Sequence, residues 1–223
     1  MRRFEAVLAV GIVVIVLGSL FVGFMASSIF SEGIETSHRA GGGGGTYHLT
    51  LLVSTNNWFS NLVGMQPAFY VVQNNHLLSS ANITLPANVP INITIINFDD
   101  GSAPTDAQFA NVTGTVGNVV YIANDSNINS TTAGGSGSGI NIGAAQPVSY
   151  VNDSNIAHTF TIQLGTTTVV NIPIEPLSVE TATFTLPDGV YHWHCMAACG
   201  SGSSGWGGAM ATNGWMGGVL DAE

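Results

Sequence analysis

The chain contains two cysteines, Cys195 and Cys199, and three residues separate them. Thiolates are soft ligands that suit copper and iron–sulfur centres, so the pair is a candidate metal site. In an oxidising compartment the same pair forms a disulfide by default. Copper held by both thiolates and a small loop closed by a disulfide are the two interpretations that the pair leaves open.

The residues before the pair predict a strand. Pro-Asp-Gly at 187–189 favours a turn, and Val190–Cys195 then has the composition of a β-strand. Side chains alternate along a strand, so two sets of residues lie on opposite faces. The first set is Tyr191, Trp193 and Cys195, and the second is His192 and His194. We expect the two histidines to face solvent or a partner protein rather than the thiols.

Two methionines near the cysteines are further soft donors. These are Met196 and Met210. Methionine is flexible and apolar, and it commonly fills irregular gaps in a core. We therefore expect both side chains to fill space in the interior.

Four motifs follow one another through the C-terminal third of the chain. They are His158-Thr-Phe, Leu186-Pro-Asp-Gly-Val-Tyr, Cys195-x-x-x-Cys199-Gly and Met216-x-x-Val-Leu. This run resembles the cupredoxin domain of subunit II of haem–copper terminal oxidases. The Gly-Trp-Met-Gly-Gly sequence at 214–218 is similar to archaeal members that have a single membrane span.

The resemblance implies a ligand set. In that family two bridging cysteines, two histidines, a methionine and a main-chain carbonyl hold a dinuclear copper centre. The corresponding residues here are His158, Cys195, Ala197 (through its carbonyl), Cys199 and Met216. Asn213 stands where the family has its second histidine, and an amide is a poorer copper ligand than imidazole. Either His192, His194, water or a carbonyl takes the unfilled coordination place, or the centre has degenerated and binds no copper.

The sequence after residue 45 predicts an all-β domain. Short runs of alternating or β-branched residues are bounded by turn residues throughout. The predicted strands are 47–54, 68–73, two within 83–97, 119–123, 148–152, 158–164, 167–172, 180–185 and 190–195. Many short strands separated by turns indicate a sandwich or barrel. The resemblance implies a cupredoxin-like Greek-key form of that fold.

The N-terminal segment predicts a membrane anchor. Ala6–Ser31 carries no charged residue, and about 20 apolar residues are enough for a helix to cross a bilayer. Arg2 and Arg3 precede this span, which by the positive-inside rule places the N-terminus in the cytoplasm. We expect residues 1–31 to form the cytoplasmic N-terminus and single transmembrane helix, 32–45 a glycine-rich linker, and 46–223 the extracytoplasmic domain. The predicted location is the cell membrane.

The charge of the predicted outer domain excludes one class of partner. Ten acidic residues and no lysine or arginine follow residue 45, and the whole chain carries a formal charge of −10. A surface without cations cannot neutralise phosphates, so the domain is not a nucleic-acid-binding protein. Such a surface suits an acidic exterior in which carboxylates lose their charge, and this stays a hypothesis.

Six Asn-x-Ser/Thr sequons make the outer domain a candidate glycoprotein. The acceptors would be Asn82, Asn92, Asn111, Asn124, Asn129 and Asn152.

Three functions from different classes remain. The first, which the resemblance favours, is a non-catalytic or electron-entry subunit of an oxygen-reducing cytochrome or quinol oxidase. Its partners would be a haem-bearing subunit I, other membrane subunits and a quinol, cytochrome or copper-protein donor. The second is a membrane-tethered electron carrier with one copper ion. The third is a glycosylated cell-surface protein without a redox role. The chain has no Gly-x-Ser-x-Gly nucleophile motif of the α/β-hydrolases.

Overall fold

A computed structural model describes residues 45–55, 67–124, 143–199 and 208–223 of the chain. The predicted anchor and nearly all of the predicted linker lie outside these residues. Within the described ranges, no helix has both the length and the apolar character needed to span a bilayer. The domain boundaries and the membrane topology therefore stay predictions.

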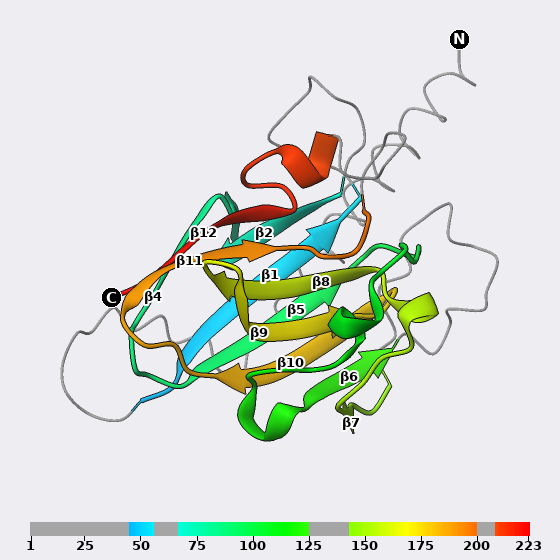
Figure 1. The fold of residues 1–223 in the computed structure, drawn as a ribbon, viewed down its shortest axis with the longest axis horizontal. Coiled ribbons are helices and arrows are strands. Elements are labelled where there is room, and N and C mark those ends of the chain that lie inside the picture. Colours follow the sequence, from blue (N-terminus) through cyan, green and yellow to red (C-terminus); the bar gives the residue numbers. More distant parts are fainter. Residues whose placement is uncertain (1–44, 56–66, 125–142, 200–207) are drawn as a thin grey trace, which may run out of the picture. The chain divides into compact units, whose positions relative to one another are not determined.

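The described chain forms two β-sheets that face each other (Figure 1). The seven-stranded sheet has the order β3 (His76–Ser79), β2 (Ala68–Gln73), β1 (Tyr47–Ser54), β5 (Ile91–Asn97), β10 (Ser178–Phe184), β6 (Val120–Asn124) and β7 (Gln146–Val148). The five-stranded sheet has the order β4 (Asn82–Leu85), β12 (Gly217–Ala222), β11 (Gly189–His194), β8 (His158–Leu164) and β9 (Thr167–Ile174). The predicted all-β sandwich is confirmed for this part of the chain.

The sheets are mixed rather than purely antiparallel. The strand β1 pairs parallel with β5 in the larger sheet, and β12 pairs parallel with β4 in the smaller one. The remaining pairs between named strands are antiparallel. Four short 3₁₀ helices lie in the described connections: η1 (Ala107–Ala110), η2 (Val116–Asn118), η3 (Asp153–Asn155) and η4 (Gly208–Ala211).

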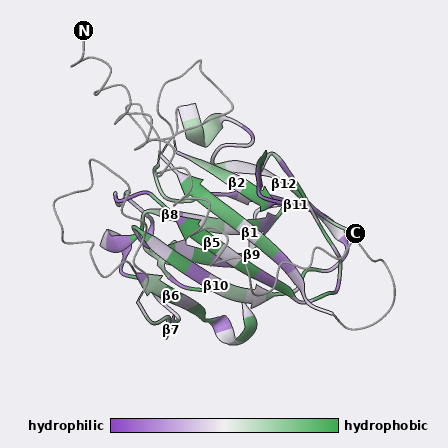
Figure 2. Cartoon of the chain, turned by 180° about the vertical axis from the view of Figure 1, so that it is seen from behind, coloured by the Kyte–Doolittle hydropathy of each residue, from purple (hydrophilic) through white to green (hydrophobic). Residues whose placement is uncertain are grey.

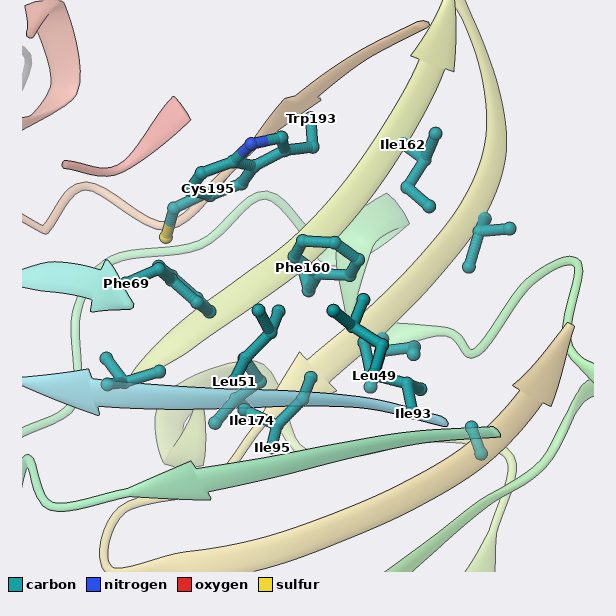
Figure 3. Close-up of a cluster of buried hydrophobic side chains, with 14 of the residues drawn as sticks. Leu49, Leu51, Phe69, Ile93, Ile95, Phe160, Ile162, Ile174, Trp193 and Cys195 are labelled. Carbon is teal, nitrogen blue, oxygen red and sulfur yellow. The ribbon is translucent and has the colours of Figure 1, made fainter. Parts of the chain in front are cut away.

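Alternation along the strands builds the core between the sheets. In β5 the odd-numbered residues from Ile91 to Asn97 are buried and the even-numbered residues are half-buried. Phe160 and Trp193 from the smaller sheet pack against Phe69 of β2. Figure 2 shows hydrophobic residues along β1, and Figure 3 shows the aliphatic side chains of the larger sheet facing the rings of Phe160 and Trp193.

Most predicted strands are present, with three differences. The predicted strand 148–152 is wrong: the strand β7 ends at Val148, and Asn152 instead caps η3 by accepting a hydrogen bond from the Ser154 amide. Strands β3 and β12 were not predicted. Asn74 and Asn75 have positive φ angles of 52° and 62°, which suits a tight hairpin turn and explains why β3 follows β2 directly.

The sequons that fall in the described ranges differ in exposure. Asn92 is half-buried in the middle of the larger sheet, and Asn129 lies outside the described residues. The other four acceptors are exposed: Asn82, Asn111, Asn124 and Asn152. The Asn124 amide also donates a hydrogen bond to the Glu175 carboxylate. Glycosylation of these residues stays a prediction.

One carboxyl group is buried inside the sandwich. Glu180 of β10 is fully buried, and its Oε1 accepts hydrogen bonds from the Glu175 amide and the Ser178 hydroxyl. Its Oε2 has no hydrogen-bond partner among the described residues. Burial raises the pKa of Glu180 to about 8. The two hydrogen bonds and the charge of His158 act against this increase, and the charge of Glu175 adds to it. The folded protein therefore holds Glu180 in its neutral form at neutral pH.

This burial predicts that the domain loses stability as pH rises. Between pH 4.5 and about 8 the folded state keeps the Glu180 proton while the unfolded chain releases it. The free energy of unfolding then falls with pH, by at most about 1.4 kcal/mol per pH unit for one proton. Glu180→Gln keeps an acceptor at Oε1 and removes the titration. In denaturant unfolding of the full chain in mild detergent, the stability of wild type relative to Glu180→Gln should decline across this window. A constant difference between the two proteins would contradict the assignment.

Candidate metal centre

The pairing of β8 with β11 brings the predicted ligands to one end of the sandwich. The two strands are antiparallel, with His194 opposite Thr161, so the end of β11 lies beside the start of β8. Cys195 follows β11 directly and continues its inward face, as the alternation predicts. His158 is the first residue of β8. Figure 3 shows the Cys195 side chain at the edge of the aromatic cluster, with its sulfur directed toward Phe69.

Three ligand atoms meet there. The Sγ atoms of Cys195 and Cys199 are 2.7 Å apart, and both cysteines are free. Nδ1 of His158 lies 3.9 Å from Sγ of Cys195. These three atoms lie within 4.8 Å of one another, and all three residues are buried. The backbone N–H of Thr159 donates to Cys195 Sγ over 3.3 Å, which favours a charged sulfur at this position.

Asp99 orients the histidine. Its Oδ2 lies 2.9 Å from Nε2 of His158, while its Oδ1 accepts the Gly101 amide. A histidine that donates from Nε2 presents Nδ1 to the thiols, and ligating histidines usually have such a partner on the other nitrogen. Burial would lower the pKa of His158, but the hydrogen bonds with Asp99 and Cys195 raise it to about 9. Burial would likewise raise the pKa of Asp99, but the hydrogen bond with His158 lowers it.

The two thiols differ in their ionisation. Burial would raise the pKa of Cys195, but hydrogen bonds with Cys199 and His158 lower it to about 5. Burial, together with the neighbouring Cys195, raises the pKa of Cys199 well above its ordinary value. Without a metal ion, a Cys195 thiolate therefore lies between a Cys199 thiol and a protonated His158. A thiolate is the form of cysteine that binds metals.

The loop after Cys195 holds the second thiol close to the first. The Ala197 carbonyl accepts the Cys199 amide at 2.8 Å and lies 3.2 Å from Cys199 Sγ. The Ala198 amide donates to the Pro104 carbonyl, and the Met196 amide donates to the Thr159 hydroxyl. The structure thus gathers His158, Cys195, Cys199 and the Ala197 carbonyl into one cluster.

Met216 and Asn213 occupy different surroundings. Met216 is fully buried, and its carbonyl accepts the Cys195 amide at 2.8 Å. Asn213 is exposed on a turn. The residue that takes the place of the family's second histidine therefore faces away from the buried cluster.

His192 and His194 lie on the outer face of the smaller sheet. Their rings stack on each other with centroids 6.2 Å apart, and His192 is exposed. Burial, followed by the charge of His192, lowers the pKa of His194. Cys195 directly follows β11 and points inward, whereas both histidines lie on the other face of that strand. Within the described residues, the ligand atoms that meet at the thiols include no atom of either histidine. Their predicted outward orientation is confirmed, and compensation by one of them stays a prediction.

The structure adds two residues that the sequence did not predict at the centre. Asp99 lies 59 residues before His158, and no spacing pattern links them. Met210, which we expected to fill space, has its Sδ atom 3.8 Å from Cys199 Sγ. The sequence signal that could have placed Met210 at the centre is its position as a soft donor in the loop between Cys199 and Met216.

The donor set fits a soft metal ion. Two thiols, an imidazole with Nδ1 directed at them and an adjacent carbonyl suit copper, and two thiols with imidazole also suit zinc. His158 begins β8 and Cys195 directly follows β11, so the register of these two strands fixes how the two residues approach each other. Copper therefore fits the residues present.

Comparisons with known proteins leave the family open. No protein-family model and no curated protein matches the chain. Among solved structures, rusticyanin from Thiobacillus ferrooxidans is similar at 13% identity and a TM-score of 0.39, covering 82% of this chain and 79% of that chain. Auracyanin B is similar at 11% identity and a TM-score of 0.30, covering 82% of this chain and 93% of that chain. Values of this size assign no ligand or activity to this chain, so the case for a metal centre rests on its side chains.

The contact with Asp99 predicts a positioning role for that residue. Asp99→Ala removes the partner of His158 Nε2 and frees the ring to turn, so copper affinity should fall by about 10–100-fold. Asp100→Ala is the matched control, because Asp100 is the exposed neighbour. Copper affinity of the full chain is measured by competition with a chelator. Equal affinities for the two variants would show that Asp99 does not position the ligand.

Proposed function

We propose that the chain is a cupredoxin-like copper electron-transfer protein, in which His158, Cys195 and Cys199 hold the metal. The observation that carries this proposal is the meeting of three ligand atoms within 4.8 Å at fully or nearly fully buried residues. Copper bound there would supply one-electron redox chemistry. The chain's own residues would bury the ion, orient the imidazole and stabilise a charged sulfur.

The burial of the cluster favours electron transfer over catalysis on a substrate. Cys195 and His158 are 0% exposed, and Cys199 is 6% exposed. A substrate cannot reach these atoms without rearranging the domain, whereas an electron can enter through packed side chains. The aromatic rings of Phe69 and Trp193 lie beside the cluster, and Phe69 meets the His158 ring edge-on with centroids 6.1 Å apart.

The pair of thiols supports the finer proposal of an oxidase role. Two cysteines in one site suit a centre with two bridging thiolates, as the resemblance to subunit II implies. In this proposal the domain lies outside the cell membrane, tethered by residues 1–31, and docks on a haem-bearing subunit of a haem–copper terminal oxidase. Any lysine or arginine at that interface belongs to the partner, since this domain has none.

A second candidate is a tethered carrier with one copper ion. The observation that favours it is the single imidazole in the cluster, given that Asn213 is exposed and the other candidate histidines face outward. Copper stoichiometry separates the two candidates. Two ions per chain support the subunit II type, and one ion supports the carrier.

The proposal predicts copper binding that depends on both cysteines. The purified full chain should bind copper with a copper–thiolate absorption band, and Cys195→Ser, Cys199→Ser and His158→Ala should each lose it. His192→Ala is the matched control, because this histidine lies on the outer face, and it should retain the band. Metal analysis and visible spectroscopy measure the outcome. A disulfide between the cysteines in the native protein, or binding of zinc alone, would refute the copper function.

The oxidase proposal predicts stable association in the membrane. Mild detergent extraction of native membranes should yield the chain together with haem-bearing subunits, detected by haem absorption in the same chromatographic fraction. A known respiratory complex that stays intact in the same extract is the control. Recovery of copper-loaded chain free of haem proteins would favour the independent carrier.

A further inference from the structure

We propose that Met210 is a copper ligand and supplies the thioether that takes the place of the missing second histidine. This inference rests on the copper function proposed above. Met210 Sδ lies 3.8 Å from Cys199 Sγ. On the other side of the cluster, His158 Nδ1 lies 3.9 Å from Cys195 Sγ. Each thiol therefore has one outside donor at nearly the same distance.

The loop that carries Met210 is tied to the centre by its backbone. Met210 belongs to η4, whose buried Ala209 accepts the Met216 amide at 3.4 Å. The Met216 carbonyl in turn accepts the Cys195 amide at 2.8 Å. The Thr212 hydroxyl donates to the Gly208 carbonyl at 2.7 Å and closes the helical turn. These bonds hold the thioether beside Cys199 from a segment that also contacts Cys195.

The alternatives for this position lie elsewhere. Asn213 is exposed on its turn, and His192 and His194 stand on the opposite face of β11. Met216 adjoins Cys195 through its main-chain carbonyl. Within the described residues, the hydrogen-bond partner of the Cys199 thiol from beyond the Cys-x-x-x-Cys loop is Met210 Sδ.

A thioether at this position changes which copper ion the site prefers. Thioethers and thiolates are soft and select monovalent copper, whereas a second imidazole would accommodate divalent copper better. Two thiolates, one imidazole and a thioether therefore form a site for Cu(I). We expect Met210 to stabilise the reduced state and so to raise the reduction potential relative to a two-histidine site.

Met196 provides a matched control. It is also half-buried and lies next to Cys195, but the contact it makes at the centre is through its backbone amide to the Thr159 hydroxyl. Leucine in place of either methionine keeps an apolar side chain of similar size and removes the sulfur. A packing role for Met210 would therefore give the same result at both positions.

The experiment titrates the full chain in mild detergent with Cu(I) against a chromogenic Cu(I) chelator. Met210→Leu should weaken Cu(I) binding by on the order of tenfold or more, and Met196→Leu should leave it unchanged. Met210→His should recover copper binding and lower the reduction potential. Near-ultraviolet circular dichroism checks that each variant is folded.

X-ray absorption of selenomethionine-labelled, copper-loaded protein gives an independent readout. Copper–selenium scattering should be present in wild type and in Met196→Leu, and Met210→Leu should lose the contribution of Met210, so that any remaining scattering comes from Met216. Scattering that is unchanged in Met210→Leu and disappears in Met216→Leu would make Met216 the thioether ligand and overturn the inference.

The outcomes separate this inference from the function on which it depends. Failure of wild type to bind copper through its cysteines overturns both proposals. Cysteine-dependent copper binding that is equal in Met210→Leu and Met196→Leu overturns the role of Met210 alone. Absence of copper–selenium scattering in wild type does the same, without relying on the folding of any variant.

Discussion

The register between β8 and β11 is the constraint on which the centre depends. With His194 opposite Thr161, Cys195 lies just past the paired residues, and the Thr159 N–H bonds to its sulfur. Because side chains alternate with a period of two, a slip of one residue would turn Cys195 to the outer face and bring His194 inward. Such a slip would expose Trp193 and the other apolar side chains that point into the core, so their burial opposes it. Packing of the core thus fixes the position of the thiols.

The strand β12 explains why Gly217 and Gly218, which belong to the Gly-Trp-Met-Gly-Gly motif, are glycines. A Cβ at Gly217 would lie 2.7 Å from Nδ1 of His194, and one at Gly218 would lie 2.6 Å from the Ser80 carbonyl. Trp193 Nε1 donates to that same carbonyl at 3.0 Å, so the indole, β12 and Ser80 pack without room for a side chain. Glycine here lets β12 lie against β11. The close pairing in turn sets where the segment from η4 to Met216 passes over the thiols.

Local sequence patterns predicted most strands and the inward orientation of Cys195. The contacts of Asp99 and Met210 with the centre depend on residues far apart in the sequence and were not predicted. Alternation predicted Cys195 inward and His192 outward, because both follow from one strand's geometry. Asp99 was beyond prediction: its contact with His158 joins the ends of strands in different sheets, and sequence spacing carries no trace of it. Met210 was identified as a soft donor but given a packing role, because nothing in the sequence shows that η4 folds back on Cys199. The strand β3 was not predicted, although Asn74 and Asn75 before it are a local signal for a hairpin turn.

The metal-free cluster brings charged groups together at one end of the sandwich. The pKa shifts favour a charged Cys195, a charged Asp99 and a protonated His158, and Asp99 is half-buried at the edge of the cluster. The sequence after residue 45 has no lysine or arginine to pair with the two anions. A buried charge without compensation is costly, and the protein elsewhere avoids that cost by keeping Glu180 protonated. Cys195 is instead held as a thiolate by its neighbours. Copper bound there would displace a proton from Nδ1 of His158, so one positive charge would replace another. The ion would also use the Thr159 hydrogen bond, which already favours the charged sulfur.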